Sequence, residues 1–139
     1  MSLFRNSERN MRFLLISFVM LAMAVLPSKA QVKEGAHLKF EQMEYDFGEV
    51  SRRGENRSCV FRFVNDGTEP LVVLSATTTC SCLKAEFSRK PVGVGESGEI
   101  KLVVESKKVD KGIFHRVVQI RSNSVGGTEI LTIKGTSKD

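Results

Sequence analysis

Apolar and polar residues alternate along most of the chain after residue 30, with the period of two that half-buried β-strands require. The clearest case is Cys59 to Val64, where Cys59, Phe61 and Phe63 share one parity. We therefore expect these three side chains to be buried, with Cys59 as a small core residue. No window of the sequence supports a long amphipathic helix.

Turn-forming residues separate seven segments of this kind. One turn is Asn65-Asp66-Gly67, in which Gly67 is able to take a positive φ. Seven short strands in about 100 residues are typical of an all-β, immunoglobulin-like antiparallel β-sandwich, and an open antiparallel barrel is the alternative. The predicted strands are Leu38 to Glu44, Cys59 to Val64, Leu71 to Ala76, Leu83 to Phe87, Glu99 to Glu105, Phe114 to Ser122 and Thr128 to Lys134.

Residues 1–30 have the pattern of a secretory signal peptide. The uncharged run from Phe13 to Leu26 is 14 residues long, too short for a bilayer that needs about 20. Ser28 and Ala30 supply the small residues that a signal peptidase accepts before Gln31. We expect a single domain over residues 31–139, without a membrane span, in the periplasm or outside the cell. An uncleaved anchor is the alternative, and translation starts at Met1 or at Met11.

The net charge of +5 is concentrated in the first thirty residues, which carry +3 of it. The remaining +2 gives no reason to expect a nucleic acid or an acidic membrane as partner. Two small basic groups are interpreted as solvated strand ends rather than ligand sites. They are Arg52, Arg53 and Arg57, and Lys107, Lys108 and Lys111.

No catalytic motif has the context that its chemistry needs. Gly93, Gly95 and Gly98 match a dinucleotide fingerprint, but a strand-like segment follows them where a helix is required. Asp46-Phe47-Gly48 copies a kinase tripeptide in a chain far too short for a kinase, and it is expected to bend into the second strand. By parity, His115 faces solvent. The sequence therefore predicts a protein that is not an enzyme and binds no cofactor.

The three cysteines, Cys59, Cys80 and Cys82, are the most reactive groups in the sequence. An oxidising compartment would pair two of them, which leaves three possible disulfides. A tight hairpin centred on Gly67 and Thr68 would set Cys59 opposite Ala76. Cys80 would then lie ~13 Å along the strand from Ala76, the position opposite Cys59. That distance is too long for a disulfide between Cys59 and Cys80 unless the chain turns back.

Three roles for Cys80 and Cys82 stay open. The first is structural, either a local disulfide or a link to Cys59 that closes a loop of about 20 residues and adds roughly 3 kcal/mol. The second is a soft-metal site in which two thiolates hold Cu(I) or part of a zinc site, with Met43 as the available thioether. The third is thiol-disulfide exchange or attachment to a partner. We expect Cys80 and Cys82 to be accessible and Cys59 to be protected.

Five motifs in a fixed order resemble an exported bacterial immunoglobulin-like family of unknown function, distantly related to the hydin and abnormal-spindle type domains. The resemblance implies a β-sandwich in the cell envelope and no established activity. Its members carry a Cys-Gly-Cys motif, which here reads Cys80-Ser81-Cys82, and serine enters positive φ less readily than glycine. The motifs are YDFGEV (Tyr45 to Val50), FRFVNDGTEPLVV (Phe61 to Val73), TTCSC (Thr78 to Cys82), KPVGVGESGEIKLVVES (Lys90 to Ser106) and IRSN (Ile120 to Asn123).

Together these observations predict a non-catalytic envelope module that binds a protein partner, or serves a structural role, through sheet edges and end loops. The alternative is a periplasmic thiol-redox or copper-handling protein that uses Cys80 and Cys82.

Overall fold

The computed structural model describes residues 34–139, which form eight strands and one turn of 3-10 helix. The predicted signal peptide, residues 1–30, lies outside the described residues. The elements are β1 (Leu38–Phe40), β2 (Glu44–Ser51), β3 (Arg57–Asn65), β4 (Val73–Thr77), β5 (Leu83–Phe87), β6 (Ser97–Val104), η1 (Ser106–Lys108), β7 (Gly112–Ser122) and β8 (Thr128–Lys138). Within residues 34–139 no helix is long and apolar enough to cross a membrane.

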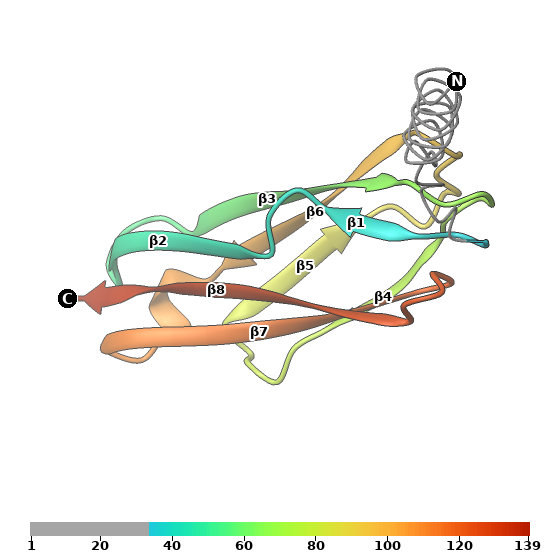
Figure 1. Cartoon of the computed structure of the whole chain (residues 1–139). Helices are drawn as coiled ribbons and strands as arrows, with labels where there is room; N and C mark the ends of the chain where they lie inside the picture. The colour runs from blue at the N-terminus through green and yellow to red at the C-terminus, as the bar shows by residue number, and fades with distance from the viewer. Residues whose placement is uncertain (1–33) are drawn as a thin grey trace, which may run out of the picture. The chain divides into compact units, whose positions relative to one another are not determined.

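The strands form two four-stranded sheets that pack face to face (Figure 1). One sheet has the order β1-β3-β6-β5 and the other the order β2-β8-β7-β4. Apolar side chains on alternate positions of both sheets fill the space between them, as expected for a sandwich. Phe61, Ile100 and Leu131 are fully buried there. The predicted all-β sandwich is confirmed.

The alternation along β3 and β7 is confirmed residue by residue. Cys59, Phe61 and Phe63 of β3 are buried, and Arg62 between them is exposed. His115 on β7 is exposed, while Phe114 before it is buried. The period of two in the sequence therefore identifies the core face of these strands correctly.

The predicted first strand, Leu38 to Glu44, is not one continuous strand. The chain forms the short β1, leaves that sheet after Phe40 and begins β2 in the other sheet at Glu44. Asp46-Phe47-Gly48 does not lead into a later strand but lies within β2, where Gly48 has φ +64°. The register with β8 shifts between Asp46 and Glu49, so the tripeptide makes a bulge.

The sandwich is not purely antiparallel, because β2 pairs with β8 in parallel. Tyr45 lies opposite Ile133 in this ladder, and Val50 lies opposite Ser137. Parallel neighbours need a long connection, and here nearly the whole domain separates the two strands. A local sequence pattern cannot reveal such a pairing.

The hairpin expected between β3 and β4 does not form. β3 pairs with β1 and β6, whereas β4 pairs with β7 in the other sheet. Cys59 therefore lies opposite Leu102 rather than Ala76. The predicted hairpin register, which set the distance between Cys59 and Cys80, is therefore wrong, because the chain crosses from one sheet to the other after Asn65.

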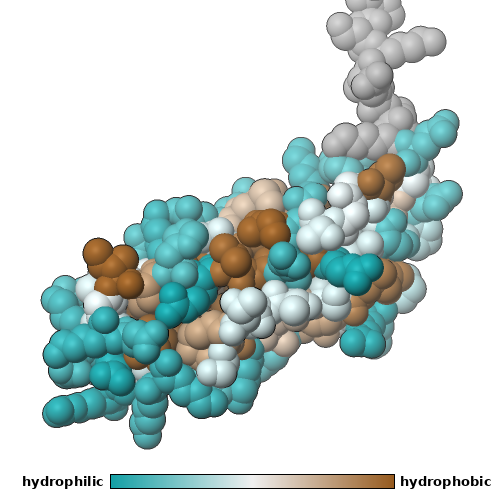
Figure 2. All heavy atoms as spheres, turned by 90° about the horizontal axis from the view of Figure 1, so that it is seen from below, coloured by the Kyte–Doolittle hydropathy of each residue, from teal (hydrophilic) through white to brown (hydrophobic). Residues whose placement is uncertain are grey.

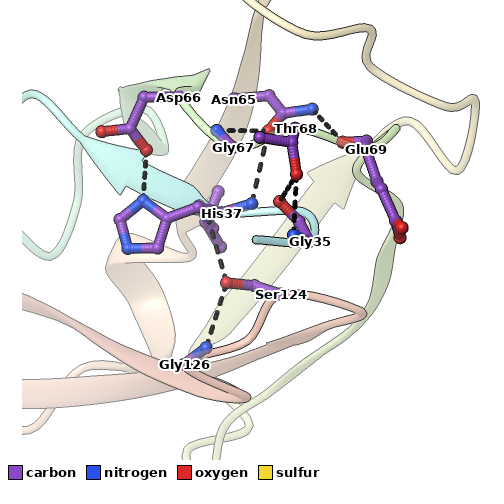
Figure 3. Close-up of polar contacts among 10 residues, drawn as sticks. Gly35, His37, Asn65, Asp66, Gly67, Thr68, Glu69, Ser124 and Gly126 are labelled. Atoms are coloured by element: carbon purple, nitrogen blue, oxygen red, sulfur yellow. Dashed lines mark hydrogen bonds and ion pairs between the residues drawn. The ribbon is translucent and has the colours of Figure 1, made fainter. Parts of the chain in front are cut away.

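A network of hydrogen bonds holds that crossing at one end of the sandwich (Figure 3). The Asn65 side chain is fully buried and uses both of its polar atoms. Its Oδ1 accepts from the backbone amides of His37, at 3.3 Å, and Gly67, at 3.1 Å. Its Nδ2 donates to the carbonyl oxygens of Glu69, at 2.8 Å, and Val92, at 3.0 Å. One side chain thus connects three segments of backbone.

Gly67 has a different role from the predicted one. Its φ is not positive, and no residue other than glycine has a positive φ among residues 34–139. Gly67 is buried against the backbone of residues 35–37, and a Cβ there would lie 2.5 Å from the amide nitrogen of His37. The position needs glycine because of this close approach of two backbones.

Candidate functional site at the Cys80–Cys82 loop

The loop that carries Cys80 and Cys82 connects β4 of one sheet to β5 of the other. It ends in a turn in which the Leu83 amide donates to the Cys80 carbonyl oxygen at 3.3 Å. The Cys80 amide donates to the Thr78 hydroxyl at 3.3 Å. Ser81 occupies the turn without a positive φ. Serine is therefore accommodated where the resembling family has glycine.

Cys80 and Cys82 form a disulfide, and their Cα atoms are 5.2 Å apart, within the usual range for such a bond. The Cys82 amide also donates to the Sγ of Cys80 at 3.2 Å. The ring spans a single residue, so the chain-entropy model assigns it only about 1.6 kcal/mol of stabilisation. That is roughly half of what closing a loop of about 20 residues through Cys59 would contribute.

The two sulfurs differ in their access to solvent. Cys82 is 1 % exposed, because it lies in the core directly before β5. Cys80 is partly exposed and packs against the edge of the core. The expectation that both residues are accessible is therefore correct for Cys80 and wrong for Cys82. Tertiary burial, which the two-residue spacing does not encode, produces the difference.

Cys59 is a free cysteine within the core and is 5 % exposed. Burial raises the pKa of its thiol from the ordinary 9.0 to about 12. The thiol therefore stays protonated at neutral pH and is a poor nucleophile. The interpretation of Cys59 as a buried, inert core residue agrees with this environment.

Cys80 lines an open depression of about 550 Å³ whose other walls come from the η1 region and from β7. Arg116 and Asp110 face each other there, with 3.5 Å between the guanidinium and the carboxylate. Lys108 forms an ion pair with Glu105. The remaining lining residues are Thr79, Ser81, His115 and Val117.

Sequence reasoning identified Cys80 but not most of the residues around it. Lys108 belongs to one of the two basic groups in the sequence, and His115 is predicted to face solvent, but no sequence pattern points to Asp110 or Arg116. All four are distant from Cys80 in sequence, and pairing in the β7 sheet places them near the loop. Charged residues at a strand end were the available signal, but such residues are common on any surface.

Three residues of the basic groups noted in the sequence, Arg52, Lys108 and Lys111, form ion pairs with acidic side chains. Arg52 and Lys111 both form ion pairs with Asp139. Hydrogen bonds from Lys108 and Lys84 hold the pKa of Glu105 below its ordinary value. These contacts agree with the interpretation of both groups as surface charges at strand ends.

Within residues 34–139 no group of three or more His, Cys, Asp or Glu side chains could hold a metal ion. The soft-metal interpretation would thus depend on the two sulfurs of Cys80 and Cys82, and these are joined to each other. Nothing in this part of the chain favours it over thiol chemistry.

Residues 38–137 match the family described as "Protein of unknown function (DUF1573)". This match covers most of the chain and confirms the resemblance to a family of unknown function. No curated protein sequence matches the chain.

Solved structures with the same fold confirm the immunoglobulin-like, PapD-like class of sandwich. A protein of unknown function from Porphyromonas gingivalis W83 is 18 % identical with a TM-score of 0.62; the match covers 80 % of this chain and 50 % of that one. The ASH/PapD-like domain 7 of human CEP192 is 11 % identical with a TM-score of 0.57, covering 83 % and 93 %. The YadV chaperone is 10 % identical with a TM-score of 0.54, covering 73 % and 52 %. The chain thus spans about half the length of the first and third of these proteins.

Proposed function

The chain belongs to the DUF1573 family of proteins of unknown function, and we propose that its sandwich is a non-catalytic binding module of the cell envelope. In this proposal, an extended segment of a partner protein adds to the free edge of β5. Main-chain hydrogen bonds would supply affinity, and neighbouring pockets would supply specificity.

The observation that carries this proposal is the regularity of the β5 edge. All five residues of β5, from Leu83 to Phe87, pair with β6 without a register shift. The other three edges are interrupted or short: β2 and β4 have register shifts, and β1 has three residues. Bulges and short strands protect edges from pairing. Among the described strands, β5 is therefore the edge best suited to receive another strand.

The surroundings of β5 add apolar surface for side chains of a partner. Ala85 and Phe87 on β5, with Ala76 and Cys80, are partly buried against the core and partly open. The more exposed apolar side chains lie on other strands, among them Leu74 of β4 and Val117 of β7. Figure 2, a view from below relative to Figure 1, shows hydrophobic residues in the middle of that face between hydrophilic ones. A depression of about 430 Å³ also adjoins the end of β5, with Phe63 and Phe87 in its lining.

Likeness of fold to a PapD-like domain and to a protein named as a chaperone supports a role in protein binding rather than catalysis. An envelope location is supported by the signal-peptide pattern of residues 1–30 and by the disulfide, since disulfides persist in oxidising compartments.

Binding at β5 is expected to protect its backbone amides from hydrogen exchange. A photo-crosslinking residue at Glu86 should capture a partner from envelope extracts, and the purified partner should then slow deuterium uptake by residues 83–87. Glu49, an exposed residue on the opposite edge strand β2, is the matched crosslinking position. Protection confined to β2, or protection of β5 by a second copy of this chain alone, would contradict the proposal.

Export is expected to leave a protein that begins at Gln31, because Ser28 and Ala30 satisfy the signal peptidase. N-terminal sequencing of the protein recovered from the envelope fraction tests this. An intact chain starting at Met1 or Met11 in the membrane fraction would instead support the uncleaved anchor.

A further inference from the structure

We propose that the Cys80–Cys82 disulfide is a thiol-exchange site with a fixed polarity. In this site an incoming thiol attacks Cys80, and Cys82 is the leaving cysteine. The proposal does not depend on docking at the β5 edge.

Access to the two sulfurs sets the polarity. Exchange requires the attacking thiolate to reach a disulfide sulfur. Cys82 is 1 % exposed and lies in the core, so an external thiol cannot approach it in the folded protein. Cys80 is partly exposed and lines the depression beside β7, where a thiol of a small molecule or of a protein can enter.

The surroundings of Cys80 also suit a sulfur that carries negative charge. The Cys82 amide donates to the Cys80 Sγ at 3.2 Å, and a hydrogen bond of this kind strengthens when the acceptor becomes a thiolate. Lys108 and Arg116 line the same depression, although each is paired with a carboxylate. The amide is therefore the contact that acts on the sulfur directly.

The disulfide contributes little to holding the fold together. It spans one residue, and the segments that it joins are already adjacent in the chain, so breaking it releases no distant contact. The protein can therefore exchange between the disulfide and dithiol forms without unfolding. Cys59 does not interfere, because it is buried and protonated at neutral pH.

The exchange balances with a thiol as co-reactant. The thiolate of the first thiol attacks Cys80 Sγ, the Cys80–Cys82 bond breaks, and its electron pair leaves on the Cys82 sulfur, which takes a proton from solvent. A mixed disulfide now joins the thiol to Cys80. A second thiolate attacks the outer sulfur of the mixed disulfide and releases Cys80, which is protonated in turn. The protein has gained two electrons and two protons, and two thiols have become one disulfide.

Two variants, each lacking one cysteine of the pair, test the polarity with oxidised glutathione as the probe. In reduced Cys82→Ser, Cys80 should form a mixed disulfide with glutathione in the native protein. In reduced Cys80→Ser, Cys82 should react at least about tenfold more slowly, because reaction at a buried sulfur requires local opening. Denaturant should abolish the difference. Cys59→Ala, made in each background, should leave the rates unchanged, and circular dichroism establishes that each variant is folded.

The wild-type protein provides a measurement that does not depend on the variants. Native oxidised protein is treated with reduced glutathione and quenched with acid, and the adduct is located by fragment mass spectrometry. The adduct is expected on Cys80. An adduct mainly on Cys82, equal rates for the two variants, or no adduct without denaturant would overturn the proposal. None of these results bears on protection of the β5 amides, so the two proposals fail separately.

Discussion

Phe61→Ala is expected to lower the free energy of unfolding by about 3 to 5 kcal/mol, through lost transfer free energy and the cavity that remains. Phe61 is fully buried near the middle of β3, opposite Ile100 of the neighbouring strand. β3 is an internal strand of its sheet, so little of the cavity can collapse without disturbing β1 or β6. Chemical denaturation followed by circular dichroism gives the change.

Arg62→Ala is the matched control for this prediction. Arg62 is the next residue along β3 and lies on the exposed face. Its substitution should change the stability by no more than about 0.5 kcal/mol. Equal losses for the two variants would show that the assignment of the buried face of β3 is wrong.

Asn65→Ala is expected to cost about 3 to 5 kcal/mol, a large effect for a polar residue. The substitution leaves two backbone amides and the Glu69 carbonyl without their partner (Figure 3), while the Val92 carbonyl still accepts from the Leu71 amide at 2.9 Å. Each buried group left unsatisfied costs about 1 to 3 kcal/mol, and water will replace part of that loss. Asn65→Asp should be at least as destabilising in neutral solution, because it buries a carboxylate whose second oxygen faces the two carbonyl oxygens and cannot donate to them.

Asn123→Ala is the comparison that separates burial from hydrogen bonding. Asn123 also connects two backbone groups, accepting from the Val72 amide at 2.8 Å and donating to the Pro70 carbonyl at 3.0 Å. It is exposed, so water can satisfy both groups, and the expected loss is about 1 kcal/mol or less. If thermal or chemical denaturation shows Asn123→Ala to be as destabilising as Asn65→Ala, burial of the Asn65 network is not the cause.

Strands with strong alternation were predictable from the sequence, and β3 and β7 are examples. β2 was not predictable in the same way, because Gly48 and the bulge at residues 46–49 interrupt its period of two. Its partner β8 is distant in sequence and runs parallel to it. Strand pairing at this separation depends on how the whole chain packs, and residues 44–51 carry no local signal for it.

The Cys80–Cys82 pair shows the same division at the candidate site. The spacing of two residues by itself determined that these cysteines are always close enough to meet. The parity of β3 determined that Cys59 is buried. Only the tertiary structure decided that Cys82 is enclosed while Cys80 is open, and that β7 and the η1 region surround the open sulfur. The physical reason is that covalent proximity is a property of the chain, whereas solvent access to a sulfur depends on which distant strands pack against it.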